Sequence, residues 1–295
     1  MEGVSDKAVI ARLIIELRNS QMLANDNILI DTAADLPDAA GGNRSRVENM
    51  HTTIGGSRKF AAVVDREFRR FDMQNGDDND PKHIEIPDHL FWTRGHSIEN
   101  YFVDAELVTA CLEQHYPEHL PGDYRDLVNA SFPSILKTCA SITLALEPTN
   151  PNGTPPDRLQ RVSTAGAVGI WQVQDNGEVS LNDQEFDRIL RARGFTQLET
   201  SMLLQRRLEF MNRLEQRSVA VSRWLCHGHL GIAFLWSAIG ALLLKHGMPS
   251  ARCQDVAFQN REAHRRGTVE QWSRACVSAA RADSPVPLLQ WLRAS

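Results

Sequence analysis

The chain has 295 residues, enough for one large domain or two smaller ones, and either could bury a real core. Its 32 Lys and Arg residues against 37 Asp and Glu residues give a net charge of −5. This balance excludes a protein that coats nucleic acid by bulk positive charge, so any site for a polyanion must be local. The five cysteines are odd in number and lack the spacing of metal-binding knuckles, so we expect reduced, buried thiols.

The first third of the sequence alternates between helical and strand-like patterns. Residues 5–19 carry apolar side chains at helical spacing and predict a helix. Apolar runs at 27–31 and 60–65 each end in an aspartate, as buried parallel strands do where a loop opens at their carboxyl end. Residues 89–102 predict a further strand and then a polar turn. This alternation favours an α/β layer within residues 1–115.

The remaining residues, 116–295, have a different character. A loop rich in proline and glycine occupies 147–158, and helical periodicity dominates from about residue 182. Long helices are predicted at 198–225 and 231–247, so the second region is expected to be mainly helical and to cover or extend the sheet. The apolar run at 230–244 is too short to span a bilayer, and no apolar leader follows Met1. We therefore expect a cytoplasmic protein without membrane contact.

Two acids, Asp65 and Glu67, follow the apolar run "FAAVV" with one residue between them. Ligands of open α/β sheets bind at the carboxyl ends of the strands, and buried carboxylates are costly there unless a cation accompanies them. Mg²⁺ accepts one or two protein carboxylates and keeps waters at its other positions. Acids at a strand-to-loop junction are also common on ordinary surfaces, so the pair alone leaves metal binding and simple solvation both open.

Motifs around this acid pair extend the pattern. Glu2 stands before a glycine with Asp6 four residues later, and a helix, a strand and a strand ending in Asp-x-acid follow. This order resembles the Toprim domain of topoisomerases, primases and overcoming-lysogenization-defect nucleases. The turn "SIENY" at 97–101 resembles a narrower Toprim-like family, whose members include stand-alone nuclease subunits encoded beside ABC-type ATPases in anti-phage systems. The stretch "CHGHLG" at 226–231 is similar to a Gly-His turn near the end of that family.

The resemblance implies a Toprim-like central parallel sheet flanked by helices. It makes Glu2 the first-motif acid, Asp65 and Glu67 the metal-binding pair, and Glu99 a further catalytic acid, with Mg²⁺ or Mn²⁺ as cofactor. The implied function is phosphodiester cleavage of DNA or RNA by an effector of prokaryotic anti-phage defence with an ABC-type ATPase partner. The alternative is a catalytically inactive binding or regulatory subunit of an ATPase complex. Only Met1 precedes Glu2, so we expect this domain to lack the family's first strand.

Basic residues surround the acid pair, and their role is open at this stage. Arg66, Arg69 and Arg70 could hold a nucleic-acid backbone near the metal. The same side chains could instead form salt bridges with nearby aspartates such as Asp72 and Asp78.

Three other interpretations compete with the nuclease. Cys226, His227 and His229 could form part of a zinc site, but no second ligand cluster follows, which favours a structural turn before the apolar helix. Phosphatases of the haloacid-dehalogenase type also carry acids at a strand end, but their nucleophile lies on the first strand, whereas Asp65 ends a later one. A platform for base stacking is less favoured than core packing for the tryptophans in or beside helical segments, which are Trp224, Trp236, Trp272 and Trp291.

Overall fold

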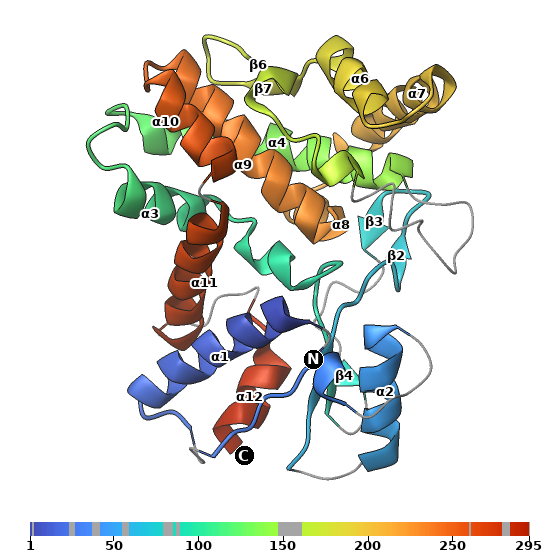
Figure 1. Cartoon of the computed structure of the whole chain (residues 1–295), viewed down its shortest axis with the longest axis vertical. Coiled ribbons are helices and arrows are strands. Elements are labelled where there is room, and N and C mark those ends of the chain that lie inside the picture. Colours follow the sequence, from blue (N-terminus) through green and yellow to red (C-terminus); the bar gives the residue numbers. More distant parts are fainter. Residues whose placement is uncertain are drawn as a thin grey trace.

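The computed structural model describes residues 1, 3–23, 27–36, 42–54, 59–78, 85–86, 89–146, 161–259, 261–278 and 284–294. Helices dominate it, and a small sheet lies among them, so the expected mixture of helix and parallel sheet is confirmed at that level. In Figure 1 the sheet, α1, α2, α11 and α12 make up the lower half of the molecule. The upper half contains α3, α4, α6, α7, α9 and α10.

The central sheet combines parallel and antiparallel pairing. β1 (Ala62–Val64) and β5 (Leu90–Trp92) are parallel, and β4 (Glu85–Ile86) pairs antiparallel with β5. The strands expected at 60–65 and at the start of 89–102 are thus confirmed. One face of the sheet packs on α2 (Asn43–Ile54), where Val47 meets the buried strand residues in a small apolar cluster.

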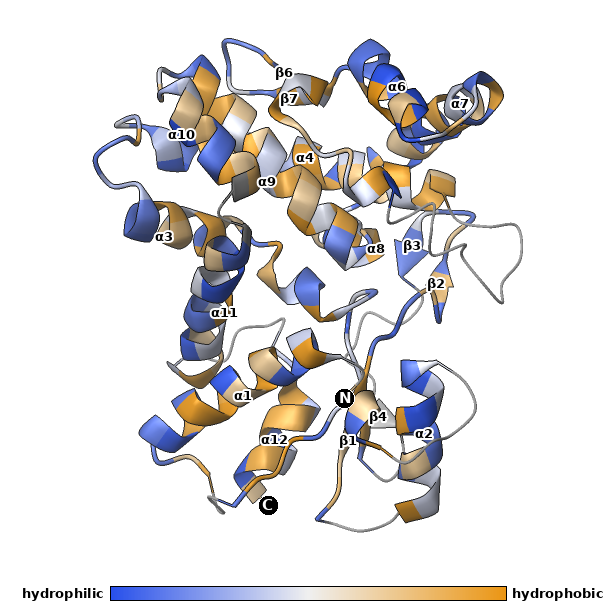
Figure 2. Cartoon of the chain, in the orientation of Figure 1, coloured by the Kyte–Doolittle hydropathy of each residue, from blue (hydrophilic) through white to orange (hydrophobic). Residues whose placement is uncertain are grey.

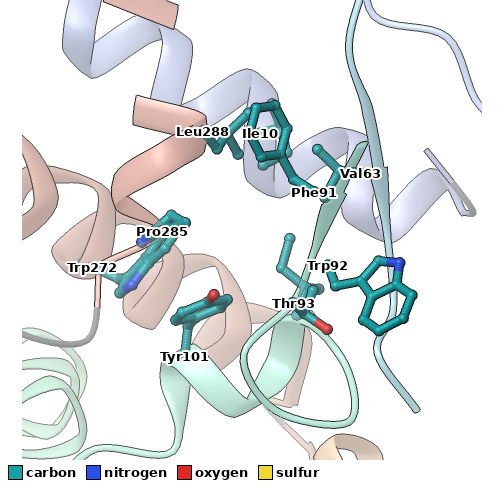
Figure 3. A pocket seen from close by; sticks show the side chains of 10 residues that line it. Ile10, Val63, Phe91, Trp92, Thr93, Tyr101, Trp272, Pro285 and Leu288 are labelled. Atoms are coloured by element: carbon teal, nitrogen blue, oxygen red, sulfur yellow. The ribbon is translucent and has the colours of Figure 1, made fainter. Parts of the chain in front are cut away.

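Three helices pack near the opposite face. The expected first helix is confirmed as α1 (Val4–Asn19), and it lies against α11 (Arg261–Ser278). With α12 (Val286–Ala294), these helices and the sheet enclose a small apolar cavity of about 10 Å³ (Figure 3). Its lining includes Ile10 of α1, Phe91 of β5 and Leu288 of α12. Residues near the carboxyl end of the chain therefore help to cover a sheet formed by the first hundred residues.

The strand predicted at 27–31 is wrong. The structure has no strand there, and Leu29 is 84% exposed, so the apolar run is not buried as a sheet strand would be. The segment instead bonds to the first residue: the amino group of Met1 donates to the carbonyl of Asp31 at 3.2 Å, and the amide of Ala33 donates to the carbonyl of Met1 at 2.7 Å.

The mainly helical character expected after residue 116 is present in the described residues. The helix predicted at 198–225 is two helices, α7 (Gln197–Leu214) and α8 (Val219–Leu225), and the side chain of Ser218 caps the second. α9 (Gly228–Lys245) ends before Gly247, which adopts a left-handed φ of 96° as glycine does readily at a helix end. The other described elements are β2 (Phe71–Asp72), β3 (Asp77–Asp78), α3 (Ala105–His115), α4 (Tyr124–Leu146), β6 (Trp171–Val173), β7 (Val179–Leu181), α6 (Asp183–Ala192), α10 (Ser250–Gln254), the π-helical turn Asp255–Gln259 and the 3₁₀ turns Ala33–Asp35, Ile98–Phe102 and Val168–Ile170.

α9 lies at the centre of the helical half. It packs beside α4, and hydrophobic colours run along α9 and α12 in Figure 2. Among the described residues, α9 is the one helix apolar and long enough to cross a membrane, but 78% of that window is buried inside the protein. α9 is therefore a core helix here. One continuous apolar core joins α1 to α9 and α11, so packing runs across the domain boundary expected near residue 115, and that division stays a prediction.

Candidate functional site

The acid pair lies at the carboxyl end of β1, beside the turn that follows β5. Asp65 comes directly after β1, and its Oδ1 accepts a hydrogen bond from the amide of Ile98 at 3.1 Å. Ile98 begins the 3₁₀ turn that contains Glu99. Because the two strands are parallel, their carboxyl ends meet at one edge of the sheet. The fold therefore brings Asp65 close to a turn that lies 33 residues further along the chain.

Glu67 has a constrained backbone. Its φ is 54°, in the left-handed region that residues other than glycine seldom occupy, and its amide donates to the carbonyl of His96 at 2.8 Å. Burial raises the pKa of Glu67, and the negative charge of Glu99 raises it further. The positive charges of Arg44, His229 and Arg69 partly oppose this rise. Glu67 therefore faces the other acids and a group of cations.

Glu99 has hydrogen-bonding and charged partners on both of its carboxylate oxygens and is only 4% exposed. Its Oε2 accepts from the hydroxyl of Ser97 at 2.7 Å. Its Oε1 lies 3.3 Å from Nη2 of Arg265 in α11 and 3.6 Å from Nδ1 of His229 in α9. Burial would raise the pKa of Glu99, but His229, the Ser97 hydrogen bond and Arg265 outweigh it and hold the pKa below its usual value. Glu99 is therefore a carboxylate around which three parts of the chain meet.

Asp6 joins this group from the first turn of α1. Its Oδ2 accepts from the amide of Gly3 at 2.9 Å. Burial, followed by the negative charge of Glu99, raises the pKa of Asp6. Sequence reasoning did not assign Asp6 to the site, although its place four residues after Glu2 was the available signal. Glu2 itself lies outside the described residues, so its predicted role stays a prediction.

The two motifs that carried the family resemblance form one interlocked structure. Nδ2 of Asn100 donates to the carbonyls of Arg223 and Cys226, at 2.8 and 2.7 Å. Nε of Arg223 donates back to the carbonyl of Asn100 at 3.0 Å. A side chain on Gly228 would place its Cβ 2.1 Å from Oγ of Ser97, so only glycine fits this approach. Segments more than 120 residues apart thus build the support beneath Glu99.

Arg66 is a structural residue, which corrects its predicted role in nucleic-acid binding. It is fully buried, at 0% exposure. Its guanidinium pairs with Oδ1 of Asp78 at 2.7 Å and donates to the backbone carbonyls of Arg69, Arg70 and Arg94. The sequence shows the charge of Arg66 but not that the loop closes around it. The salt-bridge alternative is correct for this residue.

Arg69 and Arg70 lie differently from Arg66. Arg69 pairs with Glu48 of α2 at 2.7 Å, and its guanidinium carbon lies 4.7 Å from the ring centre of Trp92. Arg70 is exposed and lies 5.4 Å from the same ring. Their predicted contact with nucleic acid stays a prediction, compatible with these positions.

No group of three or more His, Cys, Asp or Glu side chains is placed to hold a metal ion within the part of the chain that the structure describes. The zinc interpretation has no support there: the thiol of Cys226 donates to the carbonyl of His227 at 3.5 Å, and His229 faces Glu99. The carboxylate chemistry still fits Mg²⁺, which needs only one or two protein carboxylates. A cation beside Glu67 would also offset the repulsion and desolvation that raise its pKa.

A comparison of the sequence with protein-family models finds no matching family, and a comparison with curated proteins finds no similar one. The Toprim resemblance therefore rests on the motifs described above.

Proposed function

We propose that this protein is a Mg²⁺-dependent nuclease of the Toprim type that cleaves phosphodiester bonds in DNA or RNA. One observation carries the proposal: Asp65 and Glu67 after β1 and Glu99 after β5 gather at the carboxyl edge of a parallel strand pair. This is the edge where ligands of open α/β sheets bind.

Each residue has a role in this proposal. Asp65 and Glu67 would hold Mg²⁺ or Mn²⁺, which, when bound, polarises the phosphate and lowers the pKa of a coordinated water. Glu99 holds Arg265 and His229 at the edge of the site, where the positive charge of Arg265 attracts the phosphodiester. The general-base role implied for Glu2 belongs to the same proposal.

Two helix amino termini add to the positive potential of the site. α1 begins beside Asp6, and α9 begins beside His229, and both of these residues interact with Glu99. The amino end of a helix carries partial positive charge from its unpaired amides and favours anions. The site therefore has carboxylates for a metal ion and positive groups for a phosphate.

The biological setting is part of the proposal and comes from the motif resemblance. We propose an effector of prokaryotic anti-phage defence that acts in the cytoplasm together with an ABC-type ATPase. Co-purification of this chain with the ATPase encoded beside its gene tests the partnership directly.

The decisive experiment compares wild type with Asp65→Asn on panels of DNA and RNA, with Mg²⁺, with Mn²⁺ and with a chelator. Asparagine keeps the Oδ1 that accepts from Ile98 while it removes the charge, so the variant should fold. We expect metal-dependent cleavage by wild type and none by the variant. Asp175→Asn is the matched control, because Asp175 is 95% exposed and pairs only with Lys245 among the salt bridges described.

A second function, that of a non-catalytic binding subunit, is favoured by one observation. Arg265 already pairs with Glu99 in the protein alone, and His229 lies beside the same carboxylate. A folded wild-type protein that binds nucleic acid or the ATPase, and cleaves nothing with either metal, would establish this alternative.

A further inference from the structure

A tryptophan lies immediately beside the acid pair. Trp92 is the last residue of β5 and lies opposite Val64 of β1, the residue before Asp65. Adjacent strands are about 4.8 Å apart and rise about 3.3 Å per residue, so the backbones of Trp92 and Asp65 are roughly 6 Å apart. The indole ring and the acids therefore leave the same end of the strand pair, and the ring packs with Val64 in the small cluster on α2.

Trp92 is partly exposed, unlike the tryptophans of the core. Trp224, Trp236 and Trp272 are at most 2% exposed, which confirms the expectation that they belong to the core. In Figure 3 the ring of Trp92 points away from Tyr101 and Trp272, which lie across the cavity from it. Trp92 is thus a partly exposed residue at this edge, with its indole Nε1 turned inward and buried.

Two arginines lie near this ring, and they differ in exposure. Arg69 is 4.7 Å from the ring centre and is fixed by its salt bridge to Glu48. Arg70 is exposed, and its guanidinium carbon lies 5.4 Å from the ring centre. The backbone φ of Arg70 itself is 60°. Arg70 is therefore the more exposed of the two guanidinium groups beside the ring, and a guanidinium group binds phosphate readily.

We propose that Trp92, Arg69 and Arg70 form a platform for single-stranded nucleic acid, on which an unpaired base stacks against the indole ring. The phosphate beside that base then lies at the same edge of the sheet as the acid pair. Cleavage at this point depends on the proposed nuclease function, whereas binding to the platform does not.

The proposed preference of this platform for single-stranded nucleic acid follows from the partial burial of the Trp92 side chain. In a duplex both faces of every internal base are covered by its neighbours, so a partly buried indole cannot reach them. Stacking of unpaired bases on aromatic rings, beside cations that follow the backbone, is the usual way in which proteins bind single strands.

The test measures binding in the presence of a chelator, so that no cleavage occurs. Fluorescence anisotropy with end-labelled single-stranded DNA, single-stranded RNA and duplex DNA gives the three affinities. We expect Trp92→Leu to weaken single-strand binding roughly tenfold and Trp92→Phe, which keeps an aromatic face, to weaken it much less. The two single-stranded probes show whether DNA or RNA is preferred.

Arg70→Ala provides a second variant that does not disturb the core, since Arg70 is exposed. We expect weaker binding and a salt dependence whose log–log slope falls by about one. Arg188→Ala is the control, because Arg188 is 68% exposed and pairs with Glu185 on α6. That variant should bind as wild type does.

Two results would overturn the platform: duplex bound as tightly as single strands, or Arg70→Ala and a folded Trp92→Leu that both bind as wild type does. The outcome is separable from the nuclease proposal. Binding through Trp92 without cleavage by wild type would refute the nuclease alone, and cleavage without any effect of Trp92 or Arg70 on binding would refute the platform alone.

Discussion

Nη2 of Arg265 lies 3.3 Å from Oε1 of Glu99, although 166 residues separate them in the sequence. Glu99 is almost completely buried, so its charge depends on the positive groups that α9 and α11 bring to it. Residues of α9 and α11, from the other end of the chain, thus help to keep the Glu99 carboxylate at the sheet edge ionised.

Replacing Arg265 with glutamine should destabilise the protein and reduce cleavage. The change removes the guanidinium that pairs with the buried Glu99 and should cost about 1–3 kcal/mol in the free energy of unfolding. Urea denaturation and cleavage rates measure the two effects. Arg266→Gln is the adjacent control, since Arg266 is 79% exposed and pairs with Glu262 one turn away. Equal stability of both variants would show that Arg265 does not support Glu99.

Glu67→Asn should separate stability from activity. Asparagine tolerates the left-handed backbone better than glutamate, and the variant also removes a carboxylate whose pKa burial raises. We expect a gain of about 0.5–1 kcal/mol in stability together with loss of metal-dependent cleavage. Thermal melting and cleavage assays on the same preparation test this. A less stable variant would mean that Glu67 makes net stabilising contacts.

Gly228→Ala should disrupt the contact between the two motifs. The new Cβ would lie 2.1 Å from Oγ of Ser97 and 2.9 Å from Cβ of Glu99, an overpacking that typically costs about 1–3 kcal/mol. Adding Ser97→Ala should restore part of the stability, which a double-mutant cycle measures. Gly122→Ala, where a Cβ would meet nothing within 4 Å, is the control and should melt as wild type does.

Stability should fall as the pH drops from about 6.5 towards 4. Burial lowers the pKa of His227 and His264 to about 4, and it also lowers the pKa of His96 well below its usual value. Between about pH 6.5 and pH 4 the histidines of the unfolded chain bind more protons than those of the folded chain. Lowering the pH therefore favours unfolding. His264 contributes on the order of 3 kcal/mol across the window. The raised pKa values of Asp6 and Glu67 act in the opposite direction.

Urea denaturation at pH 7 and pH 5 measures this dependence. His264→Gln should have a smaller difference between the two pH values than wild type, because glutamine does not titrate. Replacement of an exposed histidine is the control, and His229 is unsuitable because it interacts with Glu99. An unchanged difference in His264→Gln would show that His264 does not stay neutral in the folded protein.

The elements that sequence analysis predicted are those with strong local patterns. α1 has helical spacing, and β1 and β5 are apolar runs with a turn behind them. The run at 27–31 has the same composition as a strand, but burial depends on what packs against it, which local sequence does not contain.

The site was predictable only in part for a related reason. Asp65, Glu67 and Glu99 follow strands, so the topology that places them together can be inferred from the order of elements. Arg265 lies in a helix with no distinguishing motif, and only the packing of α11 reveals its role. The role in nucleic-acid binding expected for Arg66 fails for the same reason. The sequence shows that this residue is charged, but it does not show that the side chain is buried.

The connection between the two halves of the chain also affects when the site can exist during synthesis. Glu99 leaves the ribosome long before Gly228 and Arg265, and at 5–20 residues per second the 166 residues between Glu99 and Arg265 take roughly 10 to 30 s. Throughout that interval the nascent chain carries its acids without the turn and the cation that hold them in place. A growing chain therefore cannot complete the arrangement around Glu99 until its synthesis is nearly finished.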